Sequence, residues 1–264
     1  MATVHQGRRL GSLGAVLLAC ACSSVSEVEY GTWSIAAVDR ETGQVGIAGA
    51  SCTSNVSGIG TIVPGVGVVI VQAMSNKDAR ALGLERLRAG ESPESILAAM
   101  QDERFDPQNQ QYAVVVLDAK QQPASFTGAT TDGWHGSASA DGVTVQGNCL
   151  VSEEVVQRTL ATFQSTRGSL TEKLVRALAA GADAGGDKRC GEQRATSAFV
   201  TVYDSVADTP DALPYFYIQV FGIEKGGEPA VALLVKHFDA LFPLCKDMRT
   251  TRLSIDPDQP SSAK

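Results

Sequence analysis

The fold is organised around residues 31–39, which read Gly-Thr-Trp-Ser-Ile-Ala-Ala-Val-Asp. Along this stretch larger apolar residues alternate with small ones, which is the period-two pattern of a β-strand. A turn sequence at residues 39–43 and a second strand-like run, Gln44 to Ala50, follow directly. The sequence therefore predicts a β-hairpin whose first strand residue, Thr32, comes immediately after a glycine.

A threonine at the first position of a chain has two groups that can act together in catalysis. Its hydroxyl can attack a carbonyl carbon, and its α-amino group, with a pKa of about 8, can take the hydroxyl proton at neutral pH. A cut between Gly31 and Thr32 would create such a residue. Without the cut Thr32 is an ordinary β-branched residue at the start of a strand, and its spacing alone favours this simpler interpretation.

Length and composition predict one folded domain. The chain has 264 residues, 44% of them hydrophobic, and no internal repeat or long linker divides it. The predicted domain covers residues 32–247, and residues 248–264 are expected to form a flexible tail. The formal net charge of -7 comes with no basic stripe, which argues against a nucleic-acid partner. With three histidines and no His-Glu-x-x-His motif, neither a metal nor an organic cofactor is expected.

The N-terminal residues are predicted to lie outside the fold. Residues 1–19 combine an arginine pair with an apolar run that is too short to span a bilayer. The run ends in Leu-Leu-Ala-Cys at Cys20, which resembles a bacterial lipoprotein signal, so Cys20 is the predicted lipidation site and residues 20–31 form a tether. The domain is then expected in the cell envelope, on the periplasmic or outer-membrane face, with the lipid anchor as its only membrane contact. A plain cleaved secretory signal is the alternative, and it also exports the folded part.

Four cysteines remain in the folded part: Cys52, Cys149, Cys190 and Cys245. An even number of cysteines in an oxidising compartment predicts two disulfides, and four cysteines allow three pairings. The preferred prediction is Cys52–Cys149 with Cys190–Cys245. The alternative is that Cys52 is a reactive thiol, although no histidine is a clear activating partner.

Strand-like and helix-like segments succeed one another in blocks. The predicted order is strands, a helix pair, strands, a second helix pair, strands and a final helix. Helix starts are indicated by Asn76, by Pro93, by Ser152 and by a capping box at residues 169–172. The almost continuous apolar run at residues 112–117 fits a strand covered on both faces. Buried strands between helical layers would satisfy this order. One such architecture, in the α+β class, is a four-layer αββα sandwich of two mainly antiparallel sheets with helices outside.

Several motifs resemble, in the same order, the bacterial and archaeal family catalogued as domain of unknown function 1028. They occupy residues 32–39, 41–48, 63–67, 72–73, 145–148 and 185–189. That family is grouped with the N-terminal-nucleophile hydrolases. The resemblance therefore implies their αββα fold, hydrolysis of an amide bond, and self-cleavage before the nucleophile. The pair Gly31-Thr32 is also similar to the Gly-Thr junction that is cut in proteasome β subunits.

Five residues form the predicted catalytic site: Thr32, Ser51, Asn148, Asp187 and Arg189. Thr32 would be the nucleophile and its own base, and Ser51 would orient its amine. The Asn148 amide would stabilise an oxyanion, and Asp187 with Arg189 would bind a substrate amine or carboxylate. Each residue also has a structural interpretation, as a strand-end hydroxyl, a turn asparagine or an ion pair. Gln72 is a further candidate.

The predicted function is hydrolysis of a small amide or peptide-like substrate through an acyl-enzyme at Thr32, in a protein that can be a homo-oligomer. Lipidation of Cys20 and a free Thr32 hold together only if a second cut removes the tether and releases the domain. Many family members have Ser-Lys where this chain has Ser51-Cys52, so a nearby amine is missing. The alternative is a non-catalytic, disulfide-stapled envelope lipoprotein domain for binding or assembly, since some relatives carry a fimbrial-assembly label.

Overall fold

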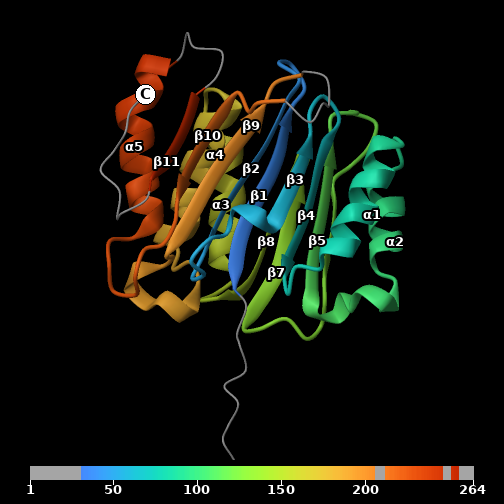
Figure 1. Ribbon diagram of the computed structural model, residues 1–264, viewed down its shortest axis with the longest axis horizontal. Coiled ribbons are helices and arrows are strands. Elements are labelled where there is room, and N and C mark those ends of the chain that lie inside the picture. Colours follow the sequence, from blue (N-terminus) through green and yellow to red (C-terminus); the bar gives the residue numbers. More distant parts are fainter. Residues whose placement is uncertain (1–30, 206–211, 246–250, 256–264) are drawn as a thin grey trace, which may run out of the picture.

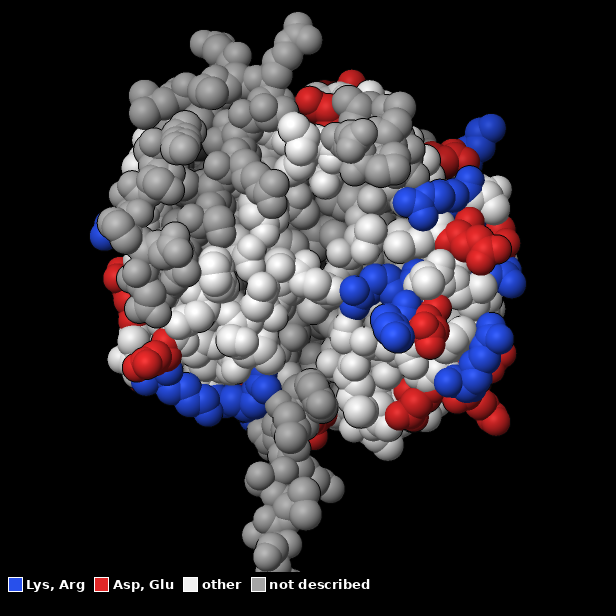
Figure 2. Space-filling model, viewed as in Figure 1, with Lys and Arg blue, Asp and Glu red and all other residues white. Residues whose placement is uncertain are grey.

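The computed structural model describes residues 31–205, 212–245 and 251–255. The predicted signal sequence, Cys20 and the tether up to residue 30 lie outside these residues, so what was expected of them stays a prediction. Within the described ranges, no helix is long and apolar enough to cross a membrane. On the face seen in Figure 2, acidic and basic side chains are intermixed over the α1 and α2 side of the molecule rather than gathered in a basic stripe.

Two sheets form the centre of the molecule. The larger sheet has seven strands in the order β11-β10-β9-β2-β1-β8-β7. Its strands are β1 Thr32–Asp39, β2 Gln44–Ser51, β7 Trp134–Ala140, β8 Val143–Leu150, β9 Ser197–Tyr203, β10 Phe216–Val220 and β11 Thr251–Ile255. The smaller sheet has the order β3-β4-β5-β6. Its strands are β3 Gly60–Val63, β4 Gly67–Ala73, β5 Gln110–Val116 and β6 Ala124–Thr127. All neighbours pair antiparallel except β10 and β11, which are parallel.

Helices cover the outer faces of both sheets (Figure 1). The smaller sheet carries α1 (Lys77–Arg88) and α2 (Pro93–Met100), while α3 (Glu154–Ser165), α4 (Leu170–Asp183) and α5 (Ala230–Cys245) pack on the larger one. The layers therefore follow one another as helices, sheet, sheet and helices. The predicted α+β class and the four-layer αββα sandwich are confirmed.

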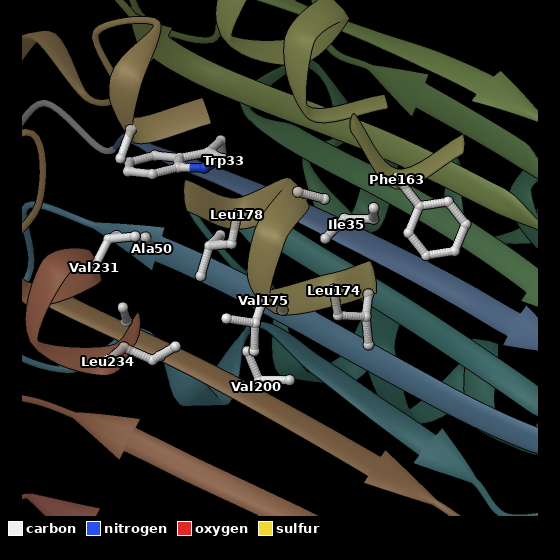
Figure 3. Close-up of a cluster of buried hydrophobic side chains, with 14 of the residues drawn as sticks. Trp33, Ile35, Ala50, Phe163, Leu174, Val175, Leu178, Val200, Val231 and Leu234 are labelled. Carbon is white, nitrogen blue, oxygen red and sulfur yellow. The ribbon is translucent and has the colours of Figure 1, made fainter. Parts of the chain in front are cut away.

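Strand β1 lies inside the larger sheet and is buried on both faces. Trp33 and Ile35 face the helical layer and join the apolar cluster that α4 and α5 complete (Figure 3). Ala36 and Val38 face the smaller sheet and belong to a second cluster. Because each face has its own apolar partners, the strand is hydrophobic almost throughout, as expected for a strand covered on both sides.

The local helix signals are confirmed at three of four places. Asn76 caps α1 by accepting hydrogen bonds from the backbone of Asp78 and Ala79, α2 begins with a proline, and Ser169 forms a capping box with Glu172. The prediction for Ser152 is wrong. Helix α3 begins at Glu154, two residues later, and its start has no side-chain cap.

Within the predicted flexible tail of residues 248–264, the structure describes Thr251–Ile255. These residues form β11, which pairs in parallel with β10. The alternation of polar and apolar residues in Thr-Arg-Leu-Ser-Ile is a strand pattern that the sequence contained. The remainder of the tail lies outside the described residues.

Candidate active site

Three strand ends meet at one end of the larger sheet. Thr32 opens β1, Ser51 closes β2, and Asn148 lies near the end of β8. Because β1 is antiparallel to both neighbours, its first residue lies beside the last residues of these strands, and Thr32 pairs directly with Asn148. Asp187 reaches the same place through a β-bridge to Leu150. The antiparallel pairing thus brings together residues that are far apart in the chain.

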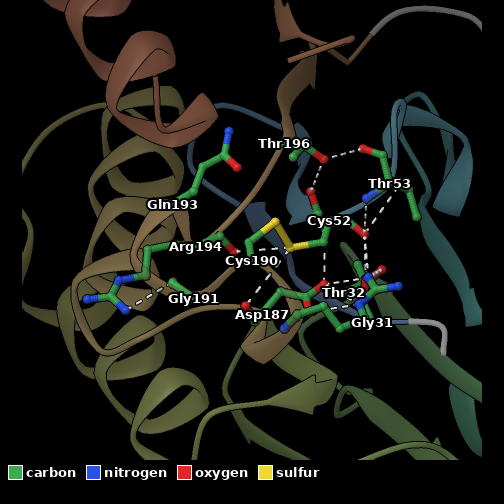
Figure 4. The surroundings of a disulfide bond; sticks show 12 residues. Gly31, Thr32, Cys52, Thr53, Asp187, Cys190, Gly191, Gln193, Arg194 and Thr196 are labelled. Carbon is green, nitrogen blue, oxygen red and sulfur yellow. Dashed lines mark hydrogen bonds and ion pairs between the residues drawn. A yellow bond between two sulfur atoms is a disulfide. The ribbon is translucent and has the colours of Figure 1, made fainter. Parts of the chain in front are cut away.

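Three side chains of the site converge on the carbonyl oxygen of Gly31, whose surroundings are drawn in Figure 4. This oxygen accepts hydrogen bonds from Arg189 Nη2 at 2.8 Å, from Ser51 Oγ at 2.5 Å and from Thr32 Oγ1 at 2.6 Å. Thr32 is 6% exposed and Ser51 is fully buried, so water is largely excluded from these bonds. Three donors in a dry site, one of them cationic, are suited to stabilise negative charge on that oxygen.

Asp187 holds Arg189 in this position. Its fully buried carboxylate accepts from Arg189 Nε at 2.9 Å and from Nη2 at 2.5 Å, a two-point contact. The same carboxylate accepts from the backbone N–H groups of Arg189 and Cys52, at 3.1 and 3.0 Å. These partners offset the cost of burying a charge, which is large for an unpaired carboxylate. The Asp187–Arg189 ion pair therefore both stabilises this part of the fold and places a guanidinium group at the site.

Gly31 fits its place because it has no side chain. A Cβ atom at this residue would lie 2.7 Å from Cys149 Cβ and 2.8 Å from Asp187 Oδ2. Both distances are far below van der Waals contact, so a larger residue would displace either β8 or the Asp187–Arg189 pair. The glycine that precedes Thr32 is therefore required by the packing of the site.

The disulfide joins Cys52 to Cys190, with their Cα atoms 5.9 Å apart, so both predicted pairings are wrong, as is a free Cys52 thiol. The physical reason is the sheet order, in which β1 lies between β2 and β8. Cys52 and Cys149 therefore flank Gly31 from opposite sides, about 9–10 Å apart at the usual strand spacing, which no disulfide spans. Cys149 is a buried thiol, and the side chain of Cys245 is outside the described part. The bond ties the end of β2 to the loop that carries Asp187 (Figure 4).

A cavity of about 260 Å³ lies beside Thr32. Its walls come from the start of β1, the loop after β2 and the turn after β4: Gly31, Thr32, Thr53, Asn55, Val56, Gly58, Ile59, Ala73, Met74 and Ser75. Arg80 supports the turn, since its Nη2 donates to Ser75 Oγ at 2.5 Å and to the Val71 carbonyl at 3.3 Å. Burial lowers the pKa of the Arg80 guanidinium. In none of the described ranges do three or more histidine, cysteine or acidic residues gather as a metal site.

A buried polar network lies behind Thr32, between the two sheets. Ser34 Oγ donates to Gln72 Oε1 and accepts from Gln146 Nε2, both at 2.6 Å. Gln72 Nε2 donates to Gln111 Oε1 at 2.9 Å and to the Thr32 carbonyl at 3.4 Å. From the sequence only Gln72 was a candidate. The signal that identifies the others is a glutamine or serine inside an otherwise apolar strand.

The comparisons with known proteins agree with this architecture. The model of the "Family of unknown function (DUF1028)" matches residues 32–221, so the match begins at Thr32. The crystal structure of protein SPO2555 from Silicibacter pomeroyi, described with the same family model, is similar with a TM-score of 0.65 and 25% sequence identity. That similarity covers 80% of this chain and 85% of the other. None of the curated proteins matches the chain.

Proposed function

The chain belongs to the family of unknown function DUF1028, and we propose that it is an amide hydrolase of the N-terminal-nucleophile type. In this proposal a cut between Gly31 and Thr32 frees the amino group of Thr32, which then serves as the base for its own hydroxyl. Because similarity of fold is only an analogy, the proposal does not rest on it. The observation that carries it is the Gly31 carbonyl oxygen, bound at once by Arg189, Ser51 and Thr32.

The cut needs the groups around this oxygen and one water molecule. Thr32 Oγ1 attacks the carbonyl carbon of Gly31, and Arg189 and Ser51 hold the negative charge that forms on the oxygen. The C–N bond between Gly31 and Thr32 then breaks, and the hydroxyl proton ends on the new amino group. Gly31 is left as an ester on Thr32 Oγ1. Water hydrolyses this ester, which releases the Gly31 carboxylate and restores the threonine hydroxyl.

The same groups serve substrate hydrolysis after Gly31 has left. The new amino group forms where Gly31 was attached, near Asp187 Oδ2 and Ser51 Oγ, which orient it. It takes the Oγ1 proton as the hydroxyl attacks the substrate carbonyl, and the proton passes to the departing amine. Water then hydrolyses the acyl ester on Thr32. Position 52 supplies no amine because it is a cysteine, here bonded to Cys190, and Arg189 brings a cation to the site instead.

The proposal includes export and a lipid anchor. The disulfide between Cys52 and Cys190 favours an oxidising compartment, since such bonds are rare in the reducing cytosol. Cys20 is the proposed lipidation site, in the cell envelope on the periplasmic or outer-membrane face. The cut before Thr32 would separate the domain from this anchor, so activation and release would be one event.

A non-catalytic envelope domain for binding or assembly is the second candidate. It is favoured by the deep burial of Thr32 and Ser51 while Gly31 is in place, and by the disulfide that closes this end of the sheet. In an uncut chain the Thr32 nitrogen is an amide and cannot act as a base. The two candidates therefore differ in the state of one covalent bond.

The test is intact mass and N-terminal sequencing of the full-length protein, expressed with its leader in a bacterium with two membranes. We expect a mature chain that starts at Thr32, and Thr32→Ala and Arg189→Gln should each leave the Gly31–Thr32 bond intact. Thr32→Ser keeps a hydroxyl and should still be cut, and Arg167→Gln, at an exposed arginine, is the matched control. A wild-type chain that keeps residues before Thr32 would sink the hydrolase proposal and favour the binding domain.

A further inference from the structure

We infer that the cavity beside Thr32 holds the acyl part of the substrate and selects small, uncharged acyl groups. The inference rests on the proposed function, because it needs Thr32 as the nucleophile. Thr32 lines the cavity, and Gly31, which also lines it, leaves with the cut, so an acyl group bound there can place its carbonyl next to the hydroxyl. A larger cavity of about 550 Å³ between α4 and α5 contains no residue of the site.

The wall of the cavity combines buried apolar residues with more exposed side chains, both polar and apolar, at its rim. Val56 and Ile59 are 3% and 8% exposed and form the apolar part, together with the half-exposed Met74. Thr53 and Asn55 supply a hydroxyl and an amide. The volume of about 260 Å³ lies just below the roughly 300–1,000 Å³ of sites for drug-sized ligands. A short acyl chain therefore fits, even with Gly31 in place.

Among the residues that the structure describes, no ionisable side chain lines the cavity. The two nearby cations are engaged elsewhere: Arg189 is paired with Asp187 and directed at the Gly31 carbonyl, and Arg80 donates to Val71 and Ser75. A charged acyl group would lose its hydration here without gaining an oppositely charged partner, which is costly. The cavity therefore disfavours both acidic and basic acyl groups.

The rim can recognise one neutral polar group. Asn55 Oδ1 already accepts from the Ser57 backbone N–H at 2.9 Å and from Gln219 Nε2 at 2.8 Å. The amide NH₂ of Asn55 is then the donor left for a ligand, and a carbonyl or hydroxyl oxygen is its complement. Ser75 offers no proton, because its hydroxyl donates to the Val71 carbonyl at 2.9 Å. The substrate class is therefore a short acyl group with an apolar stem and at most one neutral polar end.

The experiment compares three 4-nitrophenyl esters of equal chain length on the protein that starts at Thr32. 5,5-Dimethylhexanoyl is neutral, 4-sulfobutanoyl is anionic and 4-(trimethylammonio)butanoyl is cationic; their end groups are similar in size and do not attack their own esters. The rate of mass gain on the Thr32 peptide is measured for each ester and divided by its rate with free threonine. We expect transfer of the neutral group to be on the order of 100-fold faster than transfer of either charged group.

A pair of variants tests whether the selectivity for the acyl group arises in this cavity. Asn55→Asp keeps the oxygen that Ser57 and Gln219 contact and adds a negative charge to the wall, so it should favour the 4-(trimethylammonio)butanoyl ester at least tenfold relative to the neutral ester. Gln164→Glu makes the same charge change on the exposed side of α3 and should leave the ratio unchanged.

Three outcomes would overturn the inference. Equal rates for the three esters would mean that the cavity does not discriminate between acyl groups, while Thr32 would still be a nucleophile. A faster 4-sulfobutanoyl ester whose advantage is lost in Arg80→Gln would assign the cavity to anions instead. No acylation of Thr32 by any ester would sink the proposed function itself, and the inference with it.

Discussion

The interior between the two sheets has an apolar half and a polar half, and both are buried. The apolar half includes Ile47, Ile70 and Phe199, each from a different strand. The polar half consists of four side chains that are fully buried and bonded to one another: Ser34, Gln72, Gln111 and Gln146. Both halves lie in the layer between the two sheets, so the need to fill this layer does not explain why one half is polar.

The two halves differ in how precisely they fix the position of the backbone. Apolar contacts stabilise in proportion to buried area but are not directional. A buried amide must satisfy its hydrogen bonds in one geometry, because an unsatisfied group costs about 1–3 kcal/mol. Here the amides are directed at the backbone of the site: Gln72 reaches the Thr32 carbonyl, and Gln111 Nε2 donates to the Gly147 carbonyl at 2.8 Å. The polar half thus fixes the ends of β1 and β8, whereas the apolar half holds the sheets together.

The largest expected effect lies in the apolar half. Phe199 is 1% exposed and lies on β9, two strands from Thr32. Phe199→Ala should lower the free energy of unfolding by about 3–5 kcal/mol, since it leaves a large cavity. The rate of the Gly31–Thr32 cut, measured in fully folded protein, should stay within about threefold, because a small change in barrier has a small effect on rate. Urea denaturation gives the first quantity, and Leu213→Ala, at a side chain that is 62% exposed, is the control. A cut that stops in folded Phe199→Ala would break the contrast between the halves.

A smaller loss of stability with a larger loss of function is expected in the polar half. In Gln72→Leu the Ser34 hydroxyl loses its acceptor and Gln111 Oε1 loses its donor. The free energy of unfolding should fall by about 2 kcal/mol. The cut should slow on the order of 10–100-fold, because Thr32 is no longer held in position.

The matched control for Gln72→Leu is Gln164→Leu on the exposed side of α3, which should change stability by less than about 0.5 kcal/mol. Denaturation and the time course of the mass change measure the two effects separately. If folded Gln72→Leu is cut as fast as the wild type, the network does not position Thr32, and the two halves differ in composition alone.

The features that could be predicted from the sequence are those set by near neighbours in the chain. The β1–β2 hairpin follows from alternation around Thr32 and from a short turn, and the caps at Asn76 and Ser169 follow from their own helices. The order of the segments is compatible with the four layers, and the family resemblance implies them. Of the predicted site, Thr32, Ser51, Asp187 and Arg189 do lie together, while their roles remain proposals.

What could not be predicted depends on which strands become neighbours. The disulfide partner of Cys52 is decided by the insertion of β1 between β2 and β8, and local spacing carries no trace of that order. The polar network has the same origin, since Gln72 and Gln146 meet only once the two sheets stack on each other. The Gly31 carbonyl was missed because the signal lay in the backbone and not in a side chain.

The smallest expected effect concerns a buried polar atom that belongs to neither half. Tyr112 is fully buried beneath α1 and α2, and its hydroxyl has no hydrogen-bond partner among the described residues. Unlike the glutamines, this group can be removed without leaving a partner unsatisfied, so Tyr112→Phe should raise the free energy of unfolding by about 0.5–1 kcal/mol at pH 7.

Burial, and then the charge of Asp106, raise the pKa of Tyr112 above its usual value of 10. The folded state therefore favours the neutral phenol, and the stability this provides is present below pH 10 and lost as the pH rises beyond it. Urea denaturation at pH 7 and pH 11 should accordingly show a smaller decline in the free energy of unfolding for Tyr112→Phe than for the wild type.

Tyr217→Phe is the control, because that hydroxyl donates to Gln219 Oε1 and its removal should cost about 1 kcal/mol. A loss of stability at pH 7 as large in Tyr112→Phe as in Tyr217→Phe would mean that the Tyr112 hydroxyl is bonded, and that buried polar atoms outside the network are held as firmly as those within it.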